Sequence, residues 1–267
     1  MGWRSFLAEP IGDYLAIQRT LGRAFRSEEW TLLTLDRVLA RKFPKGRTFT
    51  AGMFASSAEV HAAVSPTTRR YRMLCVRKFC RYLTRFRPKT FVPDVRTFPR
   101  KHDHQAPFLL TRGEVARIVA MTATLKVGWQ NSLRRPTMCL AWILLYCCGL
   151  RRGELLRLRL MDVEMEQRVL RINETKFHKT RLVPFSPSVA QELHRYFAQR
   201  RYQGFPMDPT LPLLWNGREG DGGGPISPAT LISNWICACQ AAGVFSHNGR
   251  TPRIHDLRHS FAVETLR

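Results

Sequence analysis

The stretch MCLAWILLYCCGLRRGELLRL, residues 138–158, decides how the second half of the chain folds. Its first thirteen residues are almost entirely apolar, but they fall short of the roughly 20 residues that a membrane-spanning helix needs. They are typical of a helix that is buried on all sides, and we predict one over about 136–148. Gly149 follows, and glycine most readily adopts the left-handed conformation that ends a helix.

Arg151 stands just beyond this turn and is the first candidate site residue. The core can hold its aliphatic stem while the guanidinium reaches into a cleft. Glu154 lies three residues later, where it can orient a basic side chain. The alternative is that Arg151 is an ordinary solvated arginine, which is the commoner case in a chain so rich in arginine. This stretch alone leaves both interpretations open.

The charge of the chain indicates a polyanionic partner. Its 267 residues include 43 Lys and Arg against 20 Asp and Glu, which gives a formal net charge of +23 and an isoelectric point near 10.9. An excess of this size favours nucleic acid over a membrane surface or an acidic protein. Hydrophobic residues make up 44% of the chain, which suits one large or two ordinary globular domains.

The cysteines and the first residues indicate a cytoplasmic protein. The seven cysteines follow no regular spacing and lie in apolar or helical runs, so we expect reduced, buried thiols and no metal site. The opening stretch MGWRSFLAEP lacks the apolar run of a secretory signal. We therefore expect a cytoplasmic protein of bacterial type, without a membrane partner.

Residues 1–88 are expected to form a helical domain. The runs DYLAIQRTLGRAF and EEWTLLTLDRVLARKF repeat apolar residues at helical intervals. A third helix is predicted to open at Ser65, because a serine followed by proline is a good cap and first-turn pair. We expect this third helix to run to about Phe86.

A basic stripe marks one face of the third helix. Its members are Arg70, Arg77, Arg81 and Arg85. Such a stripe is most often the solvated face of an amphipathic helix. In a chain with this net charge it is equally a candidate surface for the phosphates of DNA.

A domain boundary is predicted at residues 89–107. The stretch from Arg87 to Pro107 has four prolines, many charges and little periodicity, which indicates an extended basic linker. A second domain, 108–267, follows. Its first helix is expected to begin at Thr111, with Glu114 in the position that completes a capping box.

A β-hairpin is predicted after the buried helix. Two short β-type runs, RVLRI and RLVPF, flank a polar turn, and predicted helices follow them. The turn carries Lys176 and Lys179. A hairpin lysine is ordinarily a surface charge, but its ammonium can also donate a proton to a phosphate ester.

The final stretch, IHDLRHSFAVETLR, reads as a helix that could grip a phosphate. His255 and Arg258 share one face within its first turn, where unpaired amides and the helix dipole favour an anion. His259 is expected to pack or to form structural hydrogen bonds. A capping or core histidine is the alternative for His255.

Taken in order, GLRRGEL, the hairpin with KTRLVPF, and HDLRHSFA closely resemble the tyrosine recombinase (phage integrase) family. The resemblance spans about 108–267, and residues 1–88 weakly resemble the core-binding domain of that family. It implies a mainly α fold with a small β-sheet (α+β), in which a helical domain and an integrase-type catalytic domain grip opposite sides of a DNA duplex.

The resemblance also implies a reaction without metal or other cofactor. In the family a tyrosine attacks the scissile phosphate and forms a 3′-phosphotyrosyl link. Arg151 and Arg258 would hold the nonbridging oxygens, because bidentate arginine contacts suit a phosphate. Lys176 would protonate the departing 5′-oxygen, with Lys179 as the second candidate. His255 would assist proton transfer, supported by His259, and Glu154 would support the arginine.

The sequence departs from the family pattern after the HDLRH helix, where the family has a Leu-Gly-His turn and then the tyrosine. All six tyrosines here precede His255: Tyr14, Tyr71, Tyr82, Tyr146, Tyr196 and Tyr202. We therefore expect a truncated recombinase that binds double-stranded DNA in the nucleoid without cutting it alone. Full-length recombinase subunits, which form a synaptic tetramer in the family, are possible partners.

Two other functions remain open at this point. A non-catalytic DNA-binding accessory protein would occupy recombination sites without cutting. A type IB topoisomerase would share the arginine–lysine–arginine chemistry, but it would relax supercoils without sequence preference.

Overall fold

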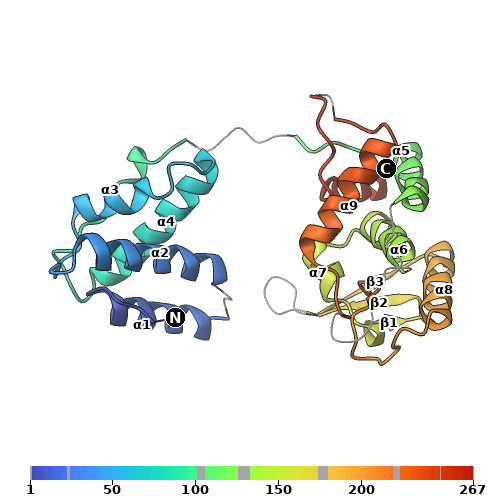
Figure 1. The fold of residues 1–267 in the computed structure, drawn as a ribbon, viewed down its shortest axis with the longest axis horizontal. Coiled ribbons are helices and arrows are strands. Elements are labelled where there is room, and N and C mark those ends of the chain that lie inside the picture. Colours follow the sequence, from blue (N-terminus) through green and yellow to red (C-terminus); the bar gives the residue numbers. More distant parts are fainter. Residues whose placement is uncertain are drawn as a thin grey trace. The chain divides into compact units, whose positions relative to one another are not determined.

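The structure is a computed structural model, and it describes residues 2–22, 25–100, 106–125, 133–173, 180–218, 223–246 and 248–266. The chain divides into two compact units, an N-terminal unit over residues 1–105 and a C-terminal unit over residues 106–267 (Figure 1). Each unit has its own hydrophobic core.

The N-terminal unit is helical. Its described α-helices are α1 (Ala8–Thr20), α2 (Arg26–Lys42), α3 (Ala51–Glu59) and α4 (Pro66–Leu83). The apolar periodicity predicted helices in the places of α1, α2 and α4. It did not single out α3, because nine residues are too short to display an amphipathic repeat. The Ser65 side chain accepts a hydrogen bond from the Thr68 backbone N–H at 3.3 Å, as expected of the cap of α4.

The first part of the predicted linker differs from an extended chain, because it packs on the N-terminal unit. Phe98 is only 5% exposed and stacks on Phe54, with ring centroids 5.9 Å apart. Arg70 donates to the Pro99 carbonyl at 3.0 Å, and Arg77 donates to the Pro93 carbonyl. Proline lacks an N–H but keeps its carbonyl acceptor, so the prolines that suggested a linker anchor this segment to α4.

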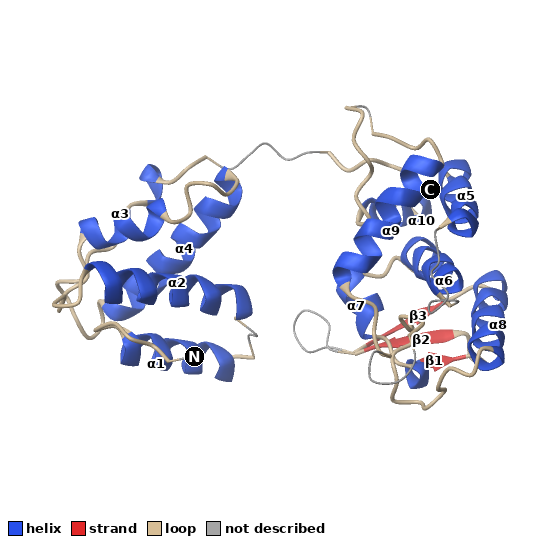
Figure 2. Ribbon diagram, viewed as in Figure 1, coloured by secondary structure: helices blue, strands red, loops and turns tan. Residues whose placement is uncertain are grey.

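The C-terminal unit is mainly α with a small antiparallel sheet, which confirms the predicted fold class. Its described elements are α5 (Arg112–Ala120), η2 (Met121–Thr124), α6 (Arg134–Cys147), α7 (Arg152–Arg157), η3 (Leu160–Asp162), β1 (Val163–Glu164), β2 (Val169–Ile172), β3 (Arg181–Pro184), α8 (Pro187–Tyr202), α9 (Pro228–Ala241) and α10 (Asp256–Thr265). Figure 2 shows the strands together at one end of this unit and α5 and α10 toward the other.

The predicted hairpin is present as β2 and β3. These strands pair antiparallel, with Val169 opposite Pro184 and Ile172 opposite Arg181. β1 pairs with β2 on the other side and gives the order β1-β2-β3. The sequence did not reveal β1, because two residues are too few to show an alternating pattern.

The buried helix α6 organises the core of the C-terminal unit. It contacts both α8 and α10, and its Trp142 packs edge-on against Trp235 of α9 with ring centroids 5.6 Å apart. α6 ends as predicted: Gly149 has a left-handed φ of +57°. A Cβ added to Gly149 would lie 2.2 Å from Cδ1 of Phe261 in α10. Glycine is therefore needed for both the turn and the close approach of α10.

All seven cysteines are free thiols, but the prediction that they are buried is wrong for Cys147 and Cys237, which are exposed, and Cys139 is only half-buried. Cys147 is next to the buried Cys148, and Cys237 lies two residues before the buried Cys239. On a helix, neighbours one or two positions apart point in different directions, so one apolar run carries cysteines on different faces. Among the described residues no helix is long and apolar enough to cross a membrane.

Candidate functional site

Glu154 is the centre of the candidate site. It lies in the first turn of α7, and its side chain is only 3% exposed. The Arg151 backbone N–H donates to Glu154 Oε2 at 2.8 Å, and the Arg151 guanidinium donates to Oε1 at 2.8 Å. Arg151 itself is 47% exposed. The structure therefore places Glu154 where it holds Arg151 from the protein side while the guanidinium still faces solvent.

Arg181 forms an ion pair with the same carboxylate. The sequence analysis did not predict this residue as part of the site. Its guanidinium NH2 donates to Glu154 Oε2 at 2.8 Å. One signal was available: alternation along β3 places Arg181 on the half-buried side with Val183, while Leu182 is exposed. An inward-facing arginine needs a carboxylate or carbonyl partner, and Glu154 supplies it.

Arg258 reaches this cluster from the first turn of α10. Its guanidinium donates to the carbonyl of Gly149, the residue that ends the buried helix. Burial lowers the pKa of Arg258, and the positive charges of Arg151 and Arg181 lower it further, while Glu154 opposes this. Two guanidinium groups thus contact the Glu154 carboxylate and a third lies close enough to be influenced by its charge, so the site carries an excess of positive charge.

His255 lies at the N-terminal end of α10 and is exposed. Its ring lies edge-on to the half-buried His259, with centroids 4.8 Å apart. Burial lowers the pKa of His255, and the nearby His259 and Arg258 lower it further. The imidazole is therefore neutral at pH 7, so it can accept a proton or hydrogen-bond an anion.

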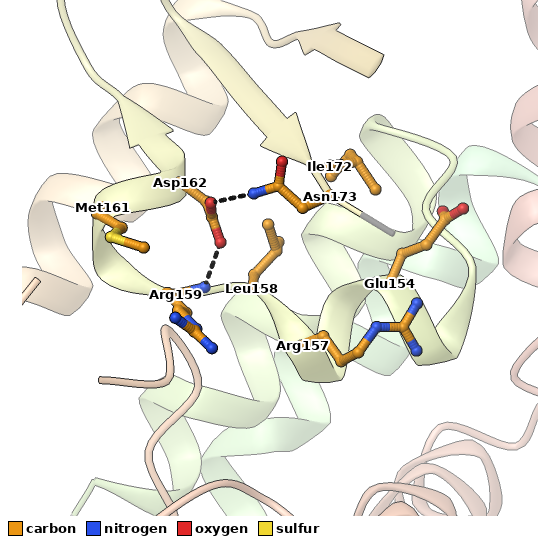
Figure 3. A pocket seen from close by; sticks show the side chains of 8 residues that line it. All are labelled: Glu154, Arg157, Leu158, Arg159, Met161, Asp162, Ile172 and Asn173. Atoms are coloured by element: carbon orange, nitrogen blue, oxygen red, sulfur yellow. Dashed lines mark hydrogen bonds between the residues drawn. The ribbon is translucent and has the colours of Figure 1, made fainter. Parts of the chain in front are cut away.

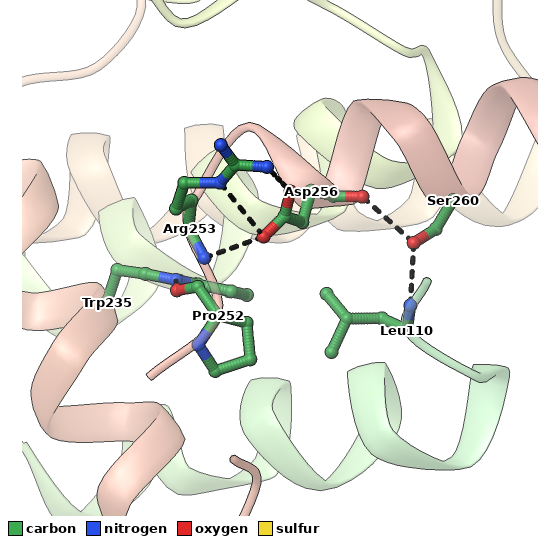
Figure 4. A network of polar contacts seen from close by, with 6 residues as sticks. All are labelled: Leu110, Trp235, Pro252, Arg253, Asp256 and Ser260. Atoms are coloured by element: carbon green, nitrogen blue, oxygen red, sulfur yellow. Dashed lines mark hydrogen bonds and ion pairs between the residues drawn. The ribbon is translucent and has the colours of Figure 1, made fainter. Parts of the chain in front are cut away.

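A polar network fixes the first turn of α10 (Figure 4). The buried Asp256 accepts hydrogen bonds from the Arg253 backbone N–H at 2.8 Å and from the Arg253 guanidinium at 3.0 Å. The Ser260 hydroxyl donates to the Asp256 carbonyl at 2.9 Å and accepts from the Leu110 backbone N–H at 2.8 Å. The network ties the helix that presents Arg258 to the chain just before α5.

A second polar network lies at a pocket of about 280 Å³ that Glu154 helps to line (Figure 3). There Asp162 Oδ1 accepts from Asn173 Nδ2 and Oδ2 accepts from the Arg159 backbone N–H, both at 2.8 Å. The Thr180 hydroxyl donates to Asn173 Oδ1 at 3.3 Å. The contact between Thr180 and Asn173 joins the two ends of the hairpin turn, and Asp162 holds the Asn173 end.

The predicted turn lysines, Lys176 and Lys179, lie outside the described residues. The structure thus brings together Arg151, Glu154 and Arg258, with His255 and His259 on the same helix as Arg258, and adds Arg181 to the predicted set. Within the described ranges, no group of three or more His, Cys, Asp or Glu side chains could hold a metal ion.

The predicted basic stripe is divided, and its last member, Arg85, lies just beyond the end of α4 at Leu83. Arg81 and Arg85 are exposed, as an open stripe requires. Arg70 and Arg77 are half-buried and donate to the carbonyls of the segment that packs on α4. Arg70 and Arg77 therefore differ from a fully solvated stripe, because the segment after α4 covers part of that face, and the contact of the stripe with DNA stays a prediction.

Residues 109–267 match the phage integrase family. This chain belongs to the phage integrase family. The resemblance to tyrosine recombinases, which are site-specific DNA recombinases, is thereby confirmed. "Putative integrase/recombinase y4rE" of Sinorhizobium fredii is 32% identical over 262 residues, which are 98% of this chain and 81% of that protein. Tyrosine recombinase XerA of Pyrococcus horikoshii is 31% identical over 160 residues, 60% of this chain and 48% of that protein.

Solved structures share the fold. The Tn1549 transposon integrase in complex with transposon right end DNA has a TM-score of 0.64 at 16% identity, covering 95% of this chain and 85% of that one. A lambda integrase dimer bound to a COC′ core site has a TM-score of 0.63 at 16% identity, covering 96% of this chain and 69% of that one.

Proposed function

We propose that this member of the phage integrase family binds duplex DNA and holds one backbone phosphate between Arg151 and Arg258. The observation that carries the proposal is that Arg151, which caps α7 and contacts the buried carboxylate of Glu154, and Arg258 of α10, which donates to the Gly149 carbonyl, lie close enough to influence each other's charge. A phosphodiester would offset the excess positive charge and accept hydrogen bonds from both arginines. The solved relatives named above that contain DNA support the same kind of partner.

The roles of the individual residues follow from their chemistry. Arg151 and Arg258 would stabilise the charge that builds on the nonbridging oxygens in the transition state. The neutral His255 would hydrogen-bond the phosphate or assist proton transfer. Lys176, or Lys179 in its place, would give a proton to the 5′-oxygen when the bond between phosphorus and that oxygen breaks. His259 would support His255.

The nucleophile is not assigned to any tyrosine of residues 1–267, because all six precede His255 in the sequence. In the proposed reaction a tyrosine oxygen bonds to phosphorus as the 5′-oxygen departs. We propose that a polypeptide of these residues binds DNA without forming the covalent link alone. A full-length recombinase subunit on the same DNA would supply the tyrosine.

The test uses duplex fragments from the DNA that flanks the gene. We expect protection of a short inverted-repeat site, with affinity that falls steeply as salt increases, because phosphate contacts release counterions. No adduct should survive denaturation. A salt-independent affinity would contradict the proposal, and relaxation of supercoiled DNA without sequence preference would indicate a type IB topoisomerase.

A mixing experiment separates a recombinase subunit from an accessory protein. The chain is combined on one DNA site with a full-length relative. In that relative, the arginine that corresponds to Arg151 is replaced by alanine. We expect strand exchange that is lost when Arg151→Ala is introduced in this chain. Arg117→Ala, on an exposed position of α5, is the matched control and should leave exchange unchanged. Binding without any exchange would indicate an accessory role.

A further inference from the structure

We propose that Arg181 is a positioning residue of the oxyanion site, acting through Glu154 on Arg151. This inference rests on the proposed function, since it assumes that Arg151 and Arg258 receive an oxyanion. Arg181 lies on β3, 30 positions after Arg151, so only the fold brings the two together. Arg181 lies within the KTRLVPF motif, but the predicted site did not include it.

The geometry around Glu154 shows how the effect is transmitted. One carboxylate oxygen, Oε1, accepts from the Arg151 guanidinium. The other, Oε2, accepts from both the Arg151 backbone N–H and the Arg181 guanidinium, each at 2.8 Å. Arg181 therefore fixes the plane of the carboxylate from the side of the sheet. With that plane fixed, Oε1 points toward Arg151 and orients its solvent-facing guanidinium.

Arg181 also compensates the negative charge of the buried Glu154 carboxylate. Glu154 is almost fully buried, and a buried carboxylate remains ionised only when charged or hydrogen-bonding partners compensate for lost hydration. Burial raises the pKa of Glu154. The hydrogen bonds from Arg151 and the positive charge of Arg181 outweigh this effect and bring the pKa below its usual value. Without Arg181 the carboxylate would hold Arg151 less firmly, because part of this compensation would be gone.

Stability alone does not explain Arg181. Its Nε–H is buried and has no hydrogen-bond partner among the residues that the structure describes, although the side chain as a whole is 34% exposed. An unpaired buried N–H is a cost that a well-packed apolar side chain on β3 would avoid. Besides compensating the charge of Glu154, Arg181 fixes the carboxylate that orients Arg151, and this precision at the arginine cluster is the role that we assign to it.

The test measures binding of tungstate, a phosphate-like oxyanion, to the whole chain by isothermal titration calorimetry. Arg181→Met keeps the aliphatic stem but loses the charge, and we expect roughly tenfold weaker tungstate binding, as for other residues that orient a ligand-binding group. Arg181→Lys keeps an ion pair with Glu154 and should restore the affinity to within about threefold. Arg151→Ala should weaken binding at least as much as Arg181→Met.

Arg171→Met is the matched control. Arg171 lies on the adjacent strand β2 and pairs with Glu164, so this variant also removes one positive charge and one ion pair from the sheet. Because Arg171 does not contact Glu154 in the described structure, its replacement should change the dissociation constant less than about twofold. Equal weakening by Arg171→Met and Arg181→Met would mean a general charge effect and would overturn the proposal.

A double-mutant cycle separates positioning from direct contact with the anion. If Arg181 acts through Glu154, then Arg181→Met should add almost nothing to the loss caused by Glu154→Gln. Additive losses would show that Arg181 touches the anion itself and would overturn the positioning role. If Arg181→Met does not fold, the Arg181→Lys variant decides, because weakening as severe as that of Arg151→Ala would also overturn it.

The outcome is separable from the proposed function. Tungstate binding with the expected pattern, but no binding to duplex DNA, would leave the inference standing and remove the proposed function. DNA binding by a chain whose Arg181 variants do not show the expected tungstate affinities would support the proposed function and overturn the inference. A wild-type chain that binds no tungstate would overturn the inference.

Discussion

Gly149 sets the geometry of the site at the scale of single residues. It ends α6 with a left-handed φ of +57°, and its carbonyl accepts a hydrogen bond from Arg258. Its missing side chain leaves the space that Phe261 of α10 occupies. One residue thus determines both where the chain turns toward Arg151 and how closely α10 approaches.

Gly149→Ala should therefore lower the free energy of unfolding by roughly 2–5 kcal/mol, since a strained φ and an overpacked contact each cost about 1–3 kcal/mol. Urea denaturation measures this. Gly113→Ala is the control, because an added Cβ meets nothing within 4 Å in the helix α5. It should be neutral or slightly stabilising. Equal effects of the two variants would contradict the account of Gly149.

Glu154 gives the site a pH dependence. Its native pKa lies below the ordinary value of 4.5, so its contribution to stability is complete above about pH 4.5 and is lost as the pH falls through the lowered native pKa. Glu154→Gln should lower the free energy of unfolding by roughly 1.5–3 kcal/mol at pH 7. The difference from wild type should shrink on acidification to about pH 3.

Urea denaturation of both proteins at the two pH values checks this, with Glu192→Gln as the control for an exposed ion pair on α8. That control should change stability by less than about 1 kcal/mol at pH 7. A stability difference for Glu154→Gln that does not vary with pH would show that its carboxylate is not held ionised by the arginines.

At the scale of elements, the fixing of α10 onto the start of α5 depends on Ser260. Its hydroxyl is the acceptor for the buried Leu110 N–H, 150 residues away in sequence. Ser260→Ala should lower the free energy of unfolding by about 1–3 kcal/mol, because the amide is left unpaired. Hydrogen exchange at Leu110 should accelerate as well.

Thr265→Ala provides a matched comparison on the same helix. Like Ser260, Thr265 donates its hydroxyl to the carbonyl four residues earlier, but it is exposed and, within the described part of the chain, accepts from no distant amide. Its replacement should change stability by less than about 0.5 kcal/mol. If both variants had the same effect, the contact between α5 and α10 would not depend on Ser260.

Elements with local signals were predictable from the sequence. The capping box of Thr111 and Glu114, the glycine end of α6 and the hairpin all arise from neighbouring residues, and the structure contains each of them. α3 and β1 were not separately predicted, because short elements show too little periodicity. Arg181 was missed for another reason: its partner Glu154 lies 27 residues away, and such contacts are set by the fold.

At the scale of the whole molecule, Arg151, Glu154, Arg181 and Arg258 all belong to the C-terminal unit, which has its own core. Residues 106–267 expressed alone should therefore unfold cooperatively in a calorimeter and bind tungstate within about threefold of the full chain. Residues 1–105 should bind none at the same concentrations. A C-terminal unit that has no cooperative transition would contradict the assignment of an independent core.

The predicted linker shows the limit of composition at this scale. Prolines and charges suggested an extended segment, yet Phe98 and its neighbours pack on the N-terminal helices. A few apolar side chains among charges are enough to dock a segment when a core offers room for them. The pairing of Arg70 and Arg77 with its carbonyls could not be inferred from spacing along one helix.

A structure of the chain bound to its selected DNA site is the most direct test of the central claim. We expect the guanidinium groups of Arg151 and Arg258 each to lie about 3 Å from nonbridging oxygens of one and the same phosphate. Glu154 should keep its hydrogen bond to Arg151 in that complex. If the two arginines contact different phosphates, or if the nearest phosphate lies beyond direct hydrogen-bond distance of both, the claim is wrong.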